Sequence, residues 1–81
     1  MKSITFFHSI IWVRCHLASR VLARVLKDYP EIAVEKLEFF THMAAAKAAG
    51  VRSFPTLVSG GQKLSGILLT EKNIRKFLEG I

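Results

Sequence analysis

The hydrophobic period of the chain changes within its first 26 residues, and this change constrains the fold more than any other feature. Residues 2–8 read K-S-I-T-F-F-H, a run of β-branched and aromatic residues typical of a strand buried on both faces. Apolar residues then recur every three or four positions, which predicts an amphipathic helix. We expect that helix to end at Tyr29-Pro30, because the residue before a proline avoids the helical region. Its predicted apolar stripe is Leu17, Ala18, Val21, Leu22, Val25 and Leu26.

The rest of the chain predicts three further strands and two further helices. Thr41 and Thr70 are the expected N-caps of these two helices, and Gly50 is the expected stop of the first. Gly60-Gly61 predicts a hairpin turn between the last two strands. The predicted elements are a strand over Ile32–Phe40, a helix over Met43–Ala49, strands over Thr56–Val58 and Lys63–Leu68, and a helix that begins at Glu71.

The order of these elements predicts one α/β domain that spans residues 1–81. A strand, a helix and a strand in succession pair their strands in parallel with a right-handed crossover. The hairpin makes the last two strands antiparallel. A four-stranded mixed sheet with helices on both faces, in the order βαβαββα, satisfies both conditions.

The charge of the chain favours anionic partners. Twelve Lys and Arg stand against six Asp and Glu, so the formal net charge is +6. We do not expect a nucleic-acid partner, because no basic motif interleaved with aromatic residues is present. The basic side of the first helix is either a solvated face or a docking face for an acidic partner. It consists of Arg14, Arg20, Arg24 and Lys27.

The single cysteine, Cys15, rules out an intramolecular disulfide and favours a reducing, cytoplasmic location. No run approaches the roughly 20 apolar residues of a membrane span, so no membrane association is expected. Residues 4–13 faintly resemble a signal peptide, but His8 and Ser9 interrupt the run, and its removal would delete the first strand. We expect a monomer.

The segment F-F-H-S-I-I-W-V-R-C-H-L-A, residues 6–18, resembles the redox motif of the thioredoxin-fold superfamily, in small thioredoxin-like or glutaredoxin-like proteins. In that family a strand ends in an aromatic residue, and a Cys-x-x-Cys pair opens the next helix. Cys15 matches the second cysteine, the resolving thiol, and Ala18 matches the alanine three residues later. Trp12 then occupies the position of the leading, nucleophilic cysteine.

Two further segments carry the same resemblance, which implies the thioredoxin-like fold. V-R-S-F-P-T-L, residues 51–57, is similar to the loop with the family's cis-proline, which makes Pro55 that proline and places Phe54 and Thr56 beside it. G-G-Q-K-L-S-G, residues 60–66, resembles the closing hairpin before the last helix. Ser65-Gly66 stands where glutaredoxins have two glycines that contribute to glutathione binding. The first strand lacks the buried carboxylate of thioredoxins, so the subfamily stays open.

The resemblance implies thiol–disulfide exchange with protein disulfides or with a reductase. It implies no bound cofactor, although glutathione is possible as a co-substrate, and it places Arg14, Phe54, Pro55 and Thr56 at the substrate. The reaction needs a thiolate that attacks a disulfide and a second thiol that resolves the mixed disulfide. Trp12 carries no thiol, so this form is expected to be inactive in dithiol exchange. The alternative function is a non-catalytic adaptor that binds protein at the same surface.

Three origins of Trp12 stay open: a natural loss, an engineered substitution, or a misread cysteine or selenocysteine codon. Trp12 can also be an ordinary core residue. Residues 15–18 can be taken instead as a monothiol motif, in which Arg14 and His16 would lower the pKa of a nucleophilic Cys15. A lone cysteine is more often buried and inert. We expect no metal site, because no pair among His8, Cys15, His16 and His42 has a recognised ligand spacing.

Overall fold

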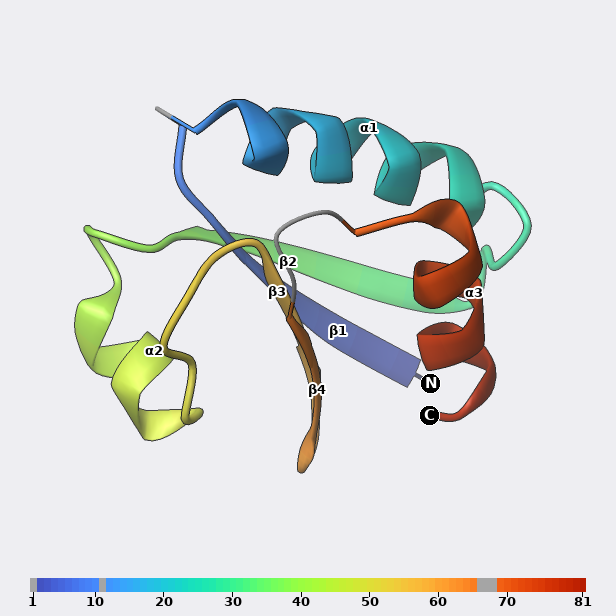
Figure 1. Cartoon of the computed structure of the whole chain (residues 1–81). Helices are drawn as coiled ribbons and strands as arrows, with labels where there is room; N and C mark the ends of the chain where they lie inside the picture. Colours follow the sequence, from blue (N-terminus) through green and yellow to red (C-terminus); the bar gives the residue numbers. More distant parts are fainter. Residues whose placement is uncertain (1, 11, 66–68) are drawn as a thin grey trace.

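The structure, a computed structural model, describes residues 2–10, 12–65 and 69–81. Its strands and helices follow one another in the order that the sequence predicts (Figure 1). In chain order they are β1 (Lys2–His8), α1 (Val13–Leu26), β2 (Ile32–Glu38), α2 (Met43–Ala48), β3 (Thr56–Ser59), β4 (Gln62–Ser65) and α3 (Glu71–Glu79). The last three residues of the predicted strand 63–68 lie outside the described residues.

The four strands form one mixed sheet in the order β2-β1-β3-β4. β1 and β2 are parallel, with Lys2 opposite Ile32, as expected for a strand–helix–strand unit. β3 runs antiparallel to both β1 and β4. Gly60 has a φ of 59°, the left-handed conformation that a tight turn between β3 and β4 requires. The predicted topology is therefore confirmed.

Helices cover both faces of the sheet, and the two faces bury unequal cores. Phe6 points into the larger core, whereas its neighbour Phe7 belongs to the smaller one, so β1 is buried on both faces. α1 and α3 lie side by side over the larger core (Figure 1). That core contains Ile4, Phe6, Ala18, Leu22, Val25, Ile32, Leu57, Leu69, Ile74 and Leu78. α2 covers the opposite face, where the fully buried members are Phe7, Ala46 and Val51.

The predicted end of the second strand is wrong by two residues. β2 stops at Glu38 because the chain turns there. Thr41 donates both its amide, to Glu38 Oε1 at 3.0 Å, and its hydroxyl, to the Glu38 carbonyl at 3.2 Å. Thr41 is therefore not the N-cap of α2. His42 holds that position, and its side chain forms no capping hydrogen bond.

Two smaller differences concern α1. The helix ends at Leu26, before the turn that leads to Tyr29-Pro30. Leu17, which the helical spacing assigns to the buried stripe, is 43% exposed, because the buried face of the helix runs through Cys15, Ala18, Leu22 and Val25 and leaves Leu17 beside it. None of the helices within the described residues is long and apolar enough to cross a membrane.

Candidate functional site

Trp12 lies at the point where α1 begins. It is the N-cap residue, with an extended backbone (φ −104°, ψ 125°) and no side-chain capping bond. Its carbonyl accepts the amides of Cys15 at 3.1 Å and of His16 at 3.4 Å, which closes the first turn. The side chain of residue 12 thus stands at the amino-terminal end of a helix, where free N–H groups and the helix dipole favour a negative charge.

The Trp12 side chain is 43% exposed and contacts residues from two parts of the chain. The ring of Phe54 lies 6.0 Å from the Trp12 ring, centroid to centroid. The guanidinium carbon of Arg14 lies 5.0 Å from the centroid of the indole, within cation–π range. The Phe54–Pro55 peptide bond is cis. The structure therefore brings together the two segments that the sequence motifs single out.

Cys15 lies one turn further into α1 and is only 2% exposed. Burial raises the pKa of the Cys15 thiol, and the Ser9 backbone N–H and the Arg14 charge only partly oppose it. His16 is not among the groups that shift this pKa, and its Nε2 lies 2.6 Å from the carbonyl oxygen of Ile10. The alternative in which Arg14 and His16 activate Cys15 as a nucleophile finds no support in this geometry.

Thr56 is fully buried, and its side chain stabilises the loop from inside. Its hydroxyl donates to the Ser53 carbonyl at 2.8 Å and lies 2.9 Å from the Ser65 hydroxyl. Pro55 is buried as well, whereas Phe54 is half-buried. Of these three predicted substrate-facing residues, only Phe54 presents a side chain at the surface.

Sequence reasoning missed two residues of this site, Phe39 and Phe40, which follow β2. The ring of Phe54 lies 4.8 Å from that of Phe39 and 5.6 Å from that of Phe40. Parallel β1 and β2 end at the same edge of the sheet, so residues just after β2 lie near those after β1. That rule, applied to an adjacent aromatic pair, could have found them. Below, Trp12, Phe39, Phe40 and Phe54 are called the aromatic cluster.

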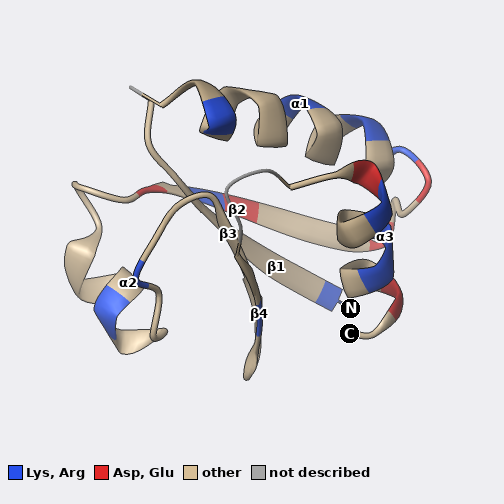
Figure 2. Cartoon of the chain, in the orientation of Figure 1, with Lys and Arg blue, Asp and Glu red and all other residues tan. Residues whose placement is uncertain are grey.

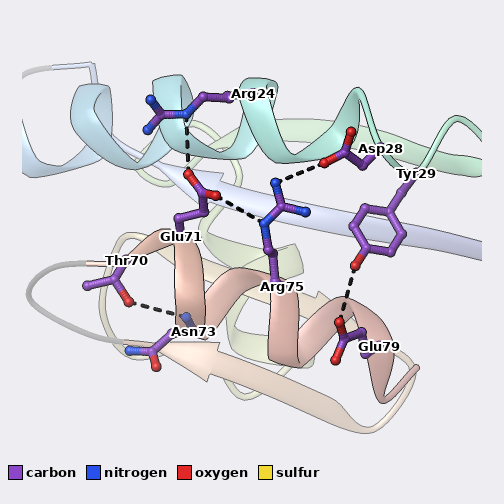
Figure 3. Close-up of polar contacts among 8 residues, drawn as sticks. All are labelled: Arg24, Asp28, Tyr29, Thr70, Glu71, Asn73, Arg75 and Glu79. Carbon is purple, nitrogen blue, oxygen red and sulfur yellow. Dashed lines mark hydrogen bonds and ion pairs between the residues drawn. The ribbon is translucent and has the colours of Figure 1, made fainter.

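Part of the basic side of α1 forms an ion pair within the chain (Figures 2 and 3). Arg24 Nε lies 3.4 Å from Glu71 Oε1, at the start of α3. Arg75 Nη2 lies 2.9 Å from Asp28 Oδ2, just after α1, and its Nε donates to Glu71 at 3.1 Å. These two carboxylates raise the pKa of Arg75.

Within the described residues, no three His, Cys, Asp or Glu side chains form a group that could hold a metal ion.

Comparison with known proteins places this geometry in a recognised fold. No protein-family model matches the chain, and no curated protein matches it. Solved structures do match. Mitochondrial thioredoxin 3 from Saccharomyces cerevisiae superposes with a TM-score of 0.85 at 22% identity, over 99% of this chain and 78% of that one.

Two prokaryotic structures agree with it. Desulfothioredoxin from Desulfovibrio vulgaris Hildenborough gives a TM-score of 0.85 at 21% identity, over 99% of this chain and 81% of the other. A mutant thioredoxin from Halobacterium salinarum NRC-1 gives 0.81 at 25% identity, over 96% and 72%. The chain therefore has the thioredoxin fold.

Proposed function

We propose that this site is built for thiol–disulfide exchange with protein disulfides, and that Trp12 in the position of the nucleophile leaves the chain unable to complete the reaction. One observation carries the proposal: Trp12 caps α1 beside Phe54, with a buried thiol one turn further in. A thiol at position 12 would lie at a helix amino terminus, which stabilises a thiolate. Cys15 would then be the resolving thiol.

The electron count explains why the chain as it stands is inactive. Reduction of one disulfide consumes two electrons and two protons, which two thiols supply as they join in a new disulfide. This chain has one cysteine, so it can at most form a mixed disulfide with a substrate. Release of that substrate would need a thiol from another molecule, such as glutathione. A cysteine or a selenocysteine at position 12 would supply the missing group.

The aromatic cluster favours a second function, protein binding without catalysis. Phe40 is 51% exposed and Trp12 43%, and both contact Phe54 beside the cis-proline. Exposed aromatic rings grouped in this way are typical of protein-binding surfaces. An extended polypeptide could pair with the backbone beside Pro55 and pack its side chains on the cluster. Loss of the nucleophile would leave such binding intact.

A substitution at position 12 tests the first function. We expect the chain to show no insulin reduction above the dithiothreitol background, and Trp12→Cys to reduce insulin. Trp12→Ser is the matched control, since it removes the indole and adds no thiol, and it should stay inactive. Trp12→Cys combined with Cys15→Ser should lose turnover.

The reductant and the outcome separate the alternatives. If glutathione rather than dithiothreitol or a thioredoxin reductase supports Trp12→Cys, the exchange is of the glutaredoxin type. A folded Trp12→Cys variant without activity would contradict the exchange function. The adaptor function would survive that result, because it depends on the aromatic surface and not on a thiol.

A further inference from the structure

A pocket of about 470 Å³ lies on the α2 side of the molecule, apart from Trp12 and Cys15. Its lining includes Phe39, Ala46 and Val51, which belong to the smaller core. Met43, 57% exposed, also lines it. The volume falls within the roughly 300–1,000 Å³ that small-molecule sites occupy.

The sequence of α2 explains why this space is open. The helix reads M-A-A-A-K-A, so four of its six side chains are single methyl groups. Ala46 is buried in the smaller core, so the apolar surface that stays open in the pocket belongs to Phe39, Met43 and Ala44. The methyl group of Ala44 is too short to fill the space.

The charges at the pocket have one sign. Lys47 and Arg52 both line it, and both are exposed. No ion pair within the described residues involves either side chain, and no carboxylate lines the pocket. Lys63 adds a third cation nearby, since its Nζ donates to the carbonyl of Gly50, another lining residue, at 3.2 Å. Figure 2 shows basic but no acidic colour on α2.

We propose that this pocket binds a small amphiphilic anion, an apolar chain or ring that carries a carboxylate. The apolar part would lie against Phe39, Met43 and Ala44, the apolar lining residues that the chain leaves partly or fully exposed. The carboxylate would lie between Lys47 and Arg52. An uncharged ligand would leave these cations without a partner, and a cationic ligand would be repelled. The pocket shares Phe39 with the aromatic cluster, but neither Trp12 nor Cys15 lines it, so binding there needs no thiol.

Amide NMR titration of the unaltered chain with three ten-carbon probes tests the ligand class. We expect decanoate to shift the amides of residues 43–52 in a saturable way. Decan-1-ol should bind the same residues at least about fivefold more weakly, and decyltrimethylammonium more weakly still. Equal affinity for all three probes, or shifts that leave Phe39 and residues 43–52 unchanged, would overturn the proposal.

Paired variants test the residues. Lys47→Gln with Arg52→Gln should weaken decanoate about fivefold and leave decan-1-ol unchanged. Lys72→Gln with Lys76→Gln removes the same charge from exposed positions of α3 and should change neither. Decanoate binding that falls equally in both pairs would show attraction to net charge alone and would refute the site.

A second pair tests the pocket itself without a change of charge. Ala44 lines the pocket, whereas its exposed neighbour Ala45 does not. Ala44→Leu should abolish saturable decanoate binding because the new side chain occupies the space, and Ala45→Leu should preserve it. Both variants keep a helix-favouring residue, so their folding is checked by far-ultraviolet circular dichroism. If Ala44→Leu folds and still binds decanoate, the pocket is not the site.

Discussion

Burial shifts the pKa values of two residues, His8 at the end of β1 and Cys15 near the start of α1. Burial raises the pKa of the Cys15 thiol and lowers that of the His8 imidazole, so both groups are held neutral. In His8, desolvation is the largest cause, and the positive charge of Lys36 adds to it. Each shift leads to a measurement.

Cys15 should react slowly with thiol reagents in the folded protein. The thiolate is the reactive species, and a raised pKa together with 2% exposure keeps both its population and its access low. We expect alkylation by iodoacetamide at pH 8 to be at least about tenfold slower in the native chain than in urea, since it requires local opening. Equal rates in the two conditions would show that Cys15 is an accessible nucleophile, as the monothiol alternative requires.

His8 should make the protein less stable as the pH falls through the ordinary histidine value of 6.5. Below that pH the unfolded chain binds a proton that the folded chain, with its lower pKa, does not yet accept. The free energy of unfolding therefore falls on acidification and levels off once the folded His8 is also protonated. Urea unfolding at pH 7.5 and 5.5 should show a smaller loss for His8→Gln than for the unaltered chain. An equal loss in both would assign the effect to other groups.

How far the sequence predicted the site depended on the residue. The motif around residues 12–15 and the Phe54-Pro55 pair came with a known geometry, so their proximity could be expected. Phe39 and Phe40 belonged to no motif, and their place depends on a turn at Glu38 that several side-chain and backbone hydrogen bonds produce. Such local bonds compete with strand pairing in ways that a hydrophobic pattern does not record.

Among the elements, α2 and α3 differ in how their first turns are capped. The Thr70 hydroxyl accepts the amide of Asn73 at 3.2 Å, which satisfies one free N–H of α3 (Figure 3). The predicted cap of α2, Thr41, bonds instead to the carbonyl of Glu38. A threonine was expected to cap each helix, but only Thr70 does so. Thr41 does not, because the turn after Glu38 holds it one residue before the cap position.

This difference predicts unequal effects of the same substitution. Thr70→Ala should lower the free energy of unfolding by about 1 kcal/mol, the usual contribution of an N-cap hydroxyl. Thr41→Ala, the matched control, should lower it by less than about 0.5 kcal/mol, because its hydroxyl is exposed and forms no cap. Both values come from urea unfolding curves with unchanged slopes. A larger loss for Thr41→Ala would restore it as the functional cap.

The length of the elements was predicted less well than their order. The order followed from periodicity and from two turns, at Gly50 with a φ of 75° and at Gly60 with a φ of 59°. In β2, Val34 and Leu37 lie three positions apart, so they cannot both lie on one face of a strand with a period of two. In the structure, Val34 packs on the larger core and Leu37 on the smaller. Both faces of β2 therefore contact apolar residues, so apolar and polar side chains do not alternate strictly along this strand.

For the whole molecule, the consequence of the fold is that residues 12–15 and 51–56 meet at one edge of the sheet. β1 and β3 are neighbours in the sheet and run antiparallel, so the end of β1 lies beside the start of β3. The start of α1 and the loop before β3 are thereby held close to each other. The likeness to thioredoxin structures over nearly the full chain reflects this arrangement.

Oxidation of Trp12→Cys tests most directly whether residue 12 and Cys15 occupy the two sulfur positions of an exchange site. We predict that a mild oxidant such as diamide converts the monomeric variant to a form that lacks two hydrogen atoms by intact-mass spectrometry, and that dithiothreitol reverses the change. The unaltered chain, with one thiol, should not change in this way. A folded Trp12→Cys variant that stays a reduced monomer, or that forms only disulfide-linked dimers, would contradict the account.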